Sequence, residues 1–137
     1  MTAIPATLFT GGALAILLIA LTQRVVALRL SGKVSLGDGG DAMLLARSRA
    51  HGNLAEYAPL LLILMLGVEM SGHSGSVWLW AIGVTILLAR ILHAIGMDLS
   101  GRGISPNKPR IFGMVLTLSA LTVLAVWALV IAAGSFA

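Results

Sequence analysis

Charged residues are confined to short stretches of this 137-residue chain, and long apolar segments lie between them. Residues 1–23, 57–68, 70–89 and 111–137 contain no Asp, Glu, Lys or Arg. A helix needs about 20 mostly apolar residues to cross roughly 30 Å of hydrocarbon at 1.5 Å per residue. The pattern therefore predicts four membrane-spanning helices, over residues 4–30, 42–70, 76–97 and 109–133.

Composition supports a membrane protein and excludes an ordinary soluble domain. Apolar residues make up 58% of the chain and charged residues only 10%, both far from the values of soluble proteins. We therefore predict an all-α integral membrane four-helix bundle that forms a single domain over residues 1–137. No Lys or Arg precedes Arg24, so the first segment lacks the basic start of a secretory signal and is expected to stay as a helix.

Basic residues gather around the first and third connections between the predicted helices. All nine lie there, namely Arg24, Arg29, Lys33, Arg47, Arg49, Arg90, Arg102, Lys108 and Arg110. Cytoplasmic connections carry the excess of Lys and Arg in membrane proteins, so we expect these two inside and both termini on the non-cytoplasmic side. The same rule explains the net charge of +4 without a nucleic-acid partner.

A polar stripe marks the start of the second predicted helix. Arg49, Asn53, Glu56 and Tyr57 fall within about 100° of arc when successive residues are spaced as in an α-helix. Glu56 follows Arg49 by seven residues and lies about 10 Å further toward the bilayer centre.

Two interpretations fit this stripe. Arg49 and Glu56 could hold helices together, each satisfying the other or a neighbour, with Tyr57 as an interfacial anchor. Alternatively, a guanidinium, an amide and a carboxylate on one stripe would suit a zwitterionic, peptide-like ligand, since ionisable groups at membrane depth often mark ligand pathways.

The third predicted helix brings Arg90, His93 and Met97 to one face. His93 fits either a hydrogen-bonded interior residue or a ligand contact. Because the three histidines, His51, His73 and His93, lack the spacing of a zinc site, we expect no metal.

Arg110 opens a stripe on the fourth predicted helix that continues through Gly113, Met114 and Thr117. Its small residues permit close helix contact. Arg110 itself fits two roles, an anchor at the membrane surface or a catalytic group. The chain contains no cysteine, so any thiol chemistry must use a thiol supplied by a substrate.

The sequence resembles the MAPEG family, the membrane-associated proteins in eicosanoid and glutathione metabolism. RAHGNLAEYAP resembles its second-helix signature, ARILHAIG its third-helix segment and PRIFGMVLT the Arg-led start of its fourth helix. The occurrence of VSLGDGG together with the second-helix motif is most similar to the small bacterial branch, which implies a bacterial inner (cytoplasmic) membrane location.

The resemblance implies a homotrimer in the lipid bilayer that binds glutathione, as a co-substrate, between subunits near the cytoplasmic face. It would activate the thiol toward lipophilic electrophiles or hydroperoxides, as a glutathione transferase or peroxidase does. Arg110 would be the catalytic residue that stabilises the thiolate. The glutathione-binding residues carried over by motif are Arg29, Arg49, Asn53, Glu56, Tyr57 and His93, although His93 and Met97 stand where family members often have tyrosines.

Two alternatives to this function remain. One is a catalytically silent family member that binds glutathione or serves as a structural membrane partner. The other, ranked last, is a small four-helix multidrug transporter. Such transporters typically rely on an acidic residue in the first helix, and the first predicted helix here has none.

Overall fold

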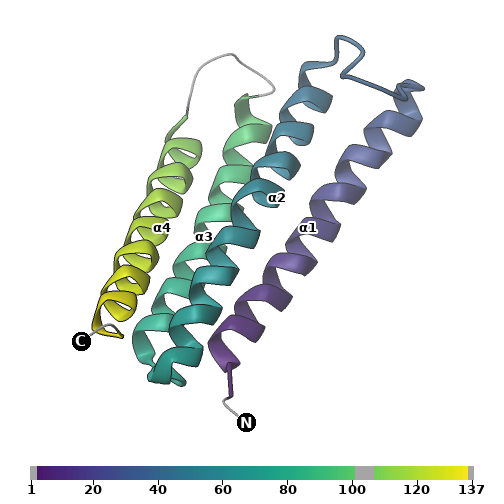
Figure 1. The fold of residues 1–137 in the computed structure, drawn as a ribbon. Helices are drawn as coiled ribbons and strands as arrows, with labels where there is room; N and C mark the ends of the chain where they lie inside the picture. The colour runs from purple at the N-terminus through teal and green to yellow at the C-terminus, as the bar shows by residue number, and fades with distance from the viewer. Residues whose placement is uncertain (1–2, 101–106, 136–137) are drawn as a thin grey trace.

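The computed structural model describes residues 3–100 and 107–135, and all the regular secondary structure in this part of the chain is helical. Four helices are long and apolar enough to cross a membrane. Figure 1 shows them side by side, with bounds α1 Pro5–Gly32, α2 Ala42–Val68, α3 Val77–Ser100 and α4 Lys108–Gly134. A short π-helical turn, η1 Glu69–His73, extends α2. The prediction of an all-α four-helix protein is confirmed, and the ends of the helices differ from the predicted ones by at most three residues.

The helices run alternately in opposite directions, so α1 begins and α4 ends at the same end of the bundle as η1 (Figure 1). At the opposite end, α1 leads into α2 through residues 33–41, and we call this the basic end. The predicted orientation, with the basic end in the cytoplasm, stays a prediction. Arg102, one of the nine basic residues, lies outside the described residues.

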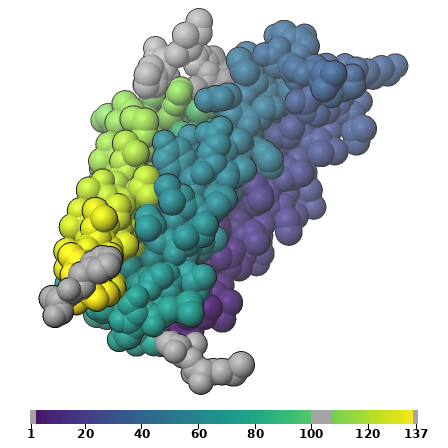
Figure 2. Space-filling model, viewed as in Figure 1, coloured from purple at the N-terminus to yellow at the C-terminus, as the bar shows by residue number. Residues whose placement is uncertain are grey.

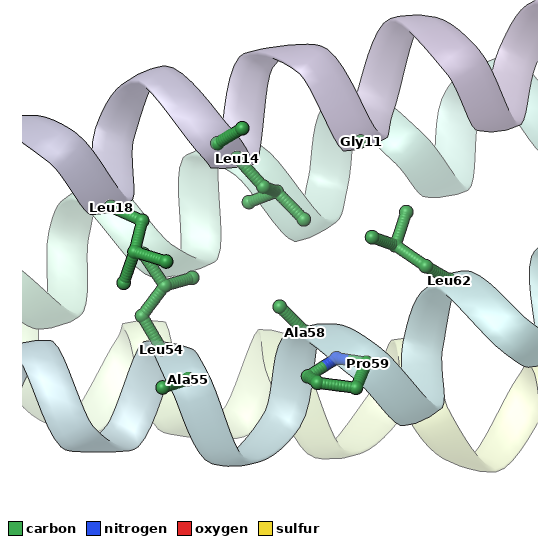
Figure 3. A pocket seen from close by; sticks show the side chains of 9 residues that line it. Gly11, Leu14, Leu18, Leu54, Ala55, Ala58, Pro59 and Leu62 are labelled. Carbon is green, nitrogen blue, oxygen red and sulfur yellow. The ribbon is translucent and has the colours of Figure 1, made fainter.

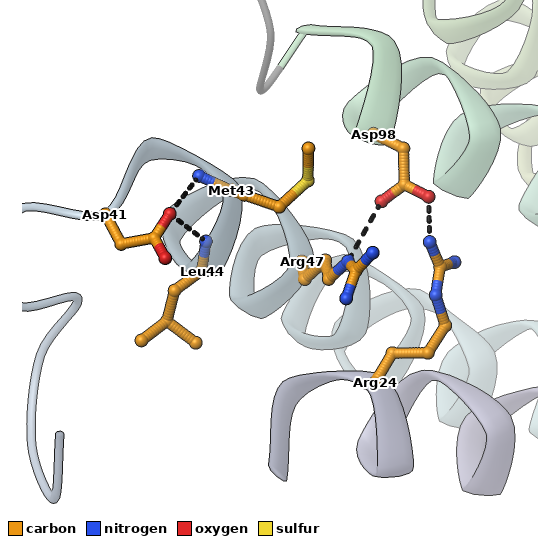
Figure 4. Close-up of polar contacts among 6 residues, drawn as sticks. All are labelled: Arg24, Asp41, Met43, Leu44, Arg47 and Asp98. Carbon is orange, nitrogen blue, oxygen red and sulfur yellow. Dashed lines mark hydrogen bonds and ion pairs between the residues drawn. The ribbon is translucent and has the colours of Figure 1, made fainter. Parts of the chain in front are cut away.

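Two side chains start helices at the basic end. Asp41 accepts hydrogen bonds from the backbone N–H groups of Met43 at 2.7 Å and Leu44 at 3.2 Å (Figure 4). Asn107 accepts from the backbone N–H of Arg110 at 3.1 Å. These caps satisfy N–H groups that have no partner within their own helices. The Asn107 cap also fixes the position of Arg110 in the first turn of α4.

At the other end of the bundle, a carboxylate from η1 caps α1. Glu69 is fully buried and accepts hydrogen bonds from the backbone N–H groups of Ala6 at 2.9 Å and Thr7 at 2.8 Å. The flanking Ile4 provides no side-chain cap. Negative charge is stabilised at a helix N-terminus, where four N–H groups lack helical partners. Glu69 thereby joins α1 to the end of α2.

The interior of the bundle is apolar, and so is much of its outer surface. α1 lies against α2 and α3 along one side of the bundle, and α4 lies on the other (Figures 1 and 2). Large apolar side chains such as Ile16 and Trp78 are about 70% exposed, as expected where helices face lipid rather than water. The largest fully buried apolar side chains are Leu44, Leu61, Met65, Val68, Leu79, Ile86 and Leu124.

Two glycines bring α3 and α4 into backbone contact. A Cβ atom on Gly113 would lie 2.6 Å from the carbonyl oxygen of Ala89 and from the backbone nitrogen of His93. A Cβ atom on Gly96 would overlap the backbone of Arg110. Small residues permit such close approach between membrane helices. This contact sets His93 and Arg110 beside each other at the α3–α4 boundary.

Candidate functional site

An ionic cluster joins three helices near the basic end. Asp98 on α3 pairs with Arg24 on α1 and lies 3.6 Å, Oδ1 to Nε, from Arg47 on α2 (Figure 4). All three side chains are about one-quarter to one-third exposed. The sequence did not predict this cluster. It holds α1, α2 and α3 in register beside the polar groups that lie deeper.

Arg90 is the central polar residue of the bundle interior. It precedes Asp98 by eight residues, which places it about 12 Å deeper along α3. Only 3% of its surface is exposed. Its guanidinium donates to Oδ1 of Asn53 on α2 and to Oγ1 of Thr117 on α4, and more weakly to the Gly113 carbonyl oxygen at 3.4 Å. One buried charge therefore connects three helices.

The aromatic ring of Tyr57 supports the same guanidinium. The Cζ atom of Arg90 lies 5.4 Å from the centre of the ring, within the range of a cation–π contact. Such a contact is strengthened where water is excluded. Tyr57 and Asn53 therefore both face α3, four residues apart on one side of α2.

A cavity of about 130 Å³ opens beside Arg90, between α2, α3 and α4. Four residues predicted for the site line it, and they are Asn53, Tyr57, His93 and Arg110. The other lining residues are Arg90, Met114, Thr117 and Leu118. In the described part of the chain, neither Arg90 nor Arg110 forms an ion pair. The cavity is therefore lined by two guanidinium groups and no carboxylate.

Arg49 and Glu56 do not line this cavity. Both are exposed on the outer side of α2, and they form no ion pair with each other or with another described residue. A carboxylate at this depth is costly to expose to hydrocarbon. The interpretation in which Arg49 and Glu56 satisfy each other is therefore not supported within one chain.

Arg29 and Met97 are also separate from the cavity. Arg29 lies near the end of α1, where it donates to the Ser35 carbonyl oxygen at 3.4 Å and lines an open hollow with Lys33. Met97 is buried in the apolar core. Among residues 3–100 and 107–135, no group of three or more His, Cys, Asp or Glu side chains could hold a metal ion.

A second hollow, between α1 and α2, is apolar and has a volume of about 260 Å³. Figure 3 shows side chains of both helices around it, with Ala58 and Pro59 on α2 facing Leu14 on α1. Ala55, beside Glu56, also lines it. The remaining lining residues are Gly11, Ala15, Leu18, Leu54 and Leu62. It provides a lipid-like surface next to the exposed carboxylate.

Sequence reasoning missed Arg90 as a site residue, although it did place Arg90 and His93 on one helical face. The signal that could have found it was position. Arg90 directly follows the 20 uncharged residues 70–89 in the third apolar segment, and buried charge inside a membrane helix commonly marks a functional site.

Four membrane-length helices, three of which line an arginine-containing cavity, define an integral membrane protein with a candidate site inside its bundle. The sequence matches the MAPEG family over residues 7–130. This chain belongs to the MAPEG family, as its three motifs predicted.

Two curated relatives are similar to part of this chain. Inner membrane protein YecN of Escherichia coli strain K12 is 40% identical over 83 residues, which are 60% of this chain and 62% of that protein. YecN of Escherichia coli O6:H1 strain CFT073 gives the same values. The chain thus spans about three-fifths of the length of these relatives. With the four helices, the similarity supports the predicted integral inner-membrane location.

Proposed function

We propose that this protein binds glutathione at the arginine-lined cavity and activates its thiol toward lipophilic electrophiles or hydroperoxides. The observation that carries the proposal is the charge of the cavity. Arg90 and Arg110 both line it, and neither has a carboxylate partner among the described residues. A cavity with this charge favours an anion, and glutathione can supply a thiolate or a carboxylate.

The charge matters most for the thiol. A free cysteine thiol has a pKa of about 8.5 and is only a few per cent ionised at pH 7, whereas the thiolate is the nucleophile. A guanidinium next to the sulfur lowers that pKa, and each unit corresponds to about 1.4 kcal/mol of preference for the charged form. Arg110 is the proposed activating group, because it lies in the first turn of α4 and lines the cavity with a positive charge.

The cavity is large enough for only part of a tripeptide. Its volume of about 130 Å³ is below the roughly 300 Å³ at which pockets for whole small molecules begin. One anionic group of glutathione would therefore enter, and the rest would lie along α2. There, Arg49 suits a carboxylate and Glu56 suits the ammonium group.

A neighbouring subunit would complete the site. Glu56 and Arg49 are exposed in a single chain, at a depth where exposure to lipid is unfavourable. A second copy that covers this side of α2 would remove both groups from lipid, and its Arg29 could then supply the carboxylate contact expected from the family. We propose a homotrimer, with glutathione bound at each boundary and the lipophilic co-substrate arriving from the bilayer.

Glutathione binding to the protein purified in mild detergent is the first test. Isothermal titration should detect saturable binding, and S-methylglutathione, which cannot form a thiolate, should bind more weakly. Native mass spectrometry should show a trimer that retains the ligand. No binding by the trimer would refute the proposal, and so would a stable monomer that binds as well.

Turnover distinguishes the enzyme from its silent alternative. A panel of lipophilic electrophiles and hydroperoxides, assayed with the glutathione-loaded protein, should reveal transferase or peroxidase activity. Binding without turnover on any member of the panel would favour the catalytically silent family member.

A further inference from the structure

Arg90 is a charged residue that is buried without a counterion. Only 3% of its surface is exposed, and its hydrogen bonds go only to neutral oxygen atoms of Asn53, Gly113 and Thr117. Its Nε atom is buried and has no hydrogen-bond partner in the described part of the chain. A buried charge without a counterion is costly, so it needs another reason to be retained.

The hydrogen bond to Asn53 determines which end of that amide faces the cavity. An Asn side chain has one accepting oxygen and one NH₂ group with two donors. Oδ1 of Asn53 accepts from Arg90, and turning the amide over would place donors against donors. No described residue accepts from Nδ2 of Asn53, which leaves both of its N–H groups for a ligand.

Thr117 is fixed in the same way. Its hydroxyl donates to the Gly113 carbonyl oxygen at 2.8 Å and accepts from Arg90. The hydroxyl hydrogen of Thr117 is therefore bonded within α4, so Thr117 does not donate to Oδ1 of Asn53. On the α2–α3 side, Nδ2 of Asn53 and Nε of Arg90 are donors without a partner among the described residues. The Tyr57 hydroxyl and the His93 ring, which line the same cavity, can each donate or accept.

From these contacts we infer that Arg90 is a positioning and specificity residue. It orients Asn53 as a pure hydrogen-bond donor and makes the cavity selective for a small anionic or strongly accepting group. This inference rests on the proposed function for its ligand, glutathione. It goes further because it assigns the selectivity to a residue deep in α3 that acts through Asn53.

The volume of the cavity agrees with a group of this size. A sphere of 130 Å³ is about 6 Å across, so an anion inside it lies within strong Coulombic range of both Arg90 and Arg110. A carboxylate or a thiolate with its methylene group fits such a space. A neutral group of equal size would leave the donors unsatisfied, which is unfavourable in a buried site.

A double-mutant cycle between Arg90 and Asn53 tests the inference. Arg90→Lys keeps the charge but loses the planar fork, and Asn53→Ala removes the oriented amide. Each should weaken glutathione binding by roughly tenfold, the loss of one good hydrogen bond. The double variant should bind no worse than the weaker single variant. Losses that multiply to about a hundredfold would show that Arg90 acts independently of Asn53 and would overturn the inference.

Acetate separates failure of the inference from failure of the proposed function. It should raise the melting temperature of the parent protein, with gluconate at equal ionic strength as the reference, and should not do so in Arg90→Met. This result supports the anion subsite even if glutathione fails to bind. Equal acetate effects in parent and variant would overturn it, even if glutathione binds.

A purely structural role for Arg90 makes a different prediction. Asn53→Asp gives Arg90 a carboxylate partner, so the bundle should melt at the same temperature or higher. Its glutathione binding should nevertheless be lost, because the N–H donors are gone and a negative charge faces the ligand. If all variants lose affinity only in proportion to their melting temperature, Arg90 merely supports the bundle and the inference fails.

Discussion

Arg110 at the start of α4 and Arg90 on α3 line one cavity, and no carboxylate among the described residues pairs with either. The two guanidinium groups differ in burial and in hydrogen bonding. Arg90 is almost fully buried and hydrogen-bonded, whereas Arg110 is half-buried and its side chain makes no ion pair in that part of the chain. This difference assigns orientation to Arg90 and charge stabilisation to Arg110 in the proposed mechanism.

Arg110→Ala should change activation more than affinity. The bound thiol should titrate at higher pH, because the variant lacks the adjacent positive charge. Ultraviolet absorbance of the bound thiolate measures this directly. Raising the pH should partly restore activity in Arg110→Ala, since more thiolate forms. The same thiol pKa in parent and variant would reduce Arg110 to an interfacial anchor and make Arg29 the next candidate.

Arg49→Ala and Glu56→Gln should show the opposite behaviour. Both residues lie outside the cavity and would grip the ligand, so glutathione affinity should fall by roughly ten- to a hundredfold, the worth of one charged hydrogen bond. Raised pH should not rescue Glu56→Gln. If isothermal titration finds unchanged affinity in both variants, the outer side of α2 does not hold the ligand.

The split of the α2 stripe shows what sequence spacing can and cannot predict. Helical periodicity put Arg49, Asn53, Glu56 and Tyr57 within one arc of about 100°. Asn53 and Tyr57 occupy the edge of this arc that turns into the bundle, and Arg49 and Glu56 occupy the edge that turns outward. Helical periodicity predicts that the four side chains share one arc of α2. The packing of α2 against α3 and α4 decides which edge of that arc is covered by the other helices.

Helix positions were predictable because a segment that crosses the hydrocarbon must be long and mostly apolar. Contacts between helices were not. The pairing of Asp98 with two arginines and the capping of α1 by Glu69 join residues more than 50 positions apart. A single sequence contains no signal for which polar groups meet across such distances.

Asp98→Asn should destabilise the bundle more than Arg24→Gln does. The first change leaves both Arg24 and Arg47 without a carboxylate, whereas the second leaves the Asp98–Arg47 pair in place. The partly exposed cluster lies between surface and buried cases, so we expect about 1 to 3 kcal/mol for Asp98→Asn. Denaturant unfolding in mixed micelles measures both. Equal losses of unfolding free energy in the two variants would mean that the Asp98–Arg47 pair does not stabilise the bundle.

Glu69→Ala should release the start of α1. Two buried N–H groups lose their acceptor, which should cost about 2 kcal/mol. Hydrogen exchange should show faster exchange at the amides of Ala6 and Thr7, with Glu69→Gln intermediate. Ser71→Ala is a matched control, because Ser71 bonds only within its own segment, to the Gly67 carbonyl oxygen. Unchanged exchange in Glu69→Ala would contradict the cap.

Gly113→Ala should separate α3 from α4. The added methyl group would meet backbone atoms of Ala89 and His93, which cannot move aside as a side-chain tip can. We expect a loss of about 1 to 3 kcal/mol, typical of overpacking, and weaker glutathione binding. Gly12→Ala is the control, since nothing lies within 4 Å of a Cβ there. Unfolding midpoints of the two variants should therefore differ clearly.

Cysteine labelling tests the orientation of the bundle. The chain contains no native cysteine, so Ser35→Cys and Ser74→Cys each create a unique thiol at opposite ends of the bundle. Both serines are exposed. An impermeant maleimide should label Ser74→Cys from outside intact spheroplasts and Ser35→Cys only after lysis. Labelling of both from one side would contradict the four-span arrangement.

The capping of α1 by Glu69 constrains how the chain is built during synthesis. Ala6 and Thr7 emerge from the ribosome more than 60 residues before the carboxylate that satisfies them. Until α2 has brought Glu69 to the same side of the bilayer, these two amides lack the acceptor that they have in the folded bundle. The start of α1 therefore reaches its final hydrogen bonding only after α2 has crossed the membrane. A ribosome-bound fragment that ends before Glu69 should leave the start of α1 open to exchange, and lengthening it past η1 should close it.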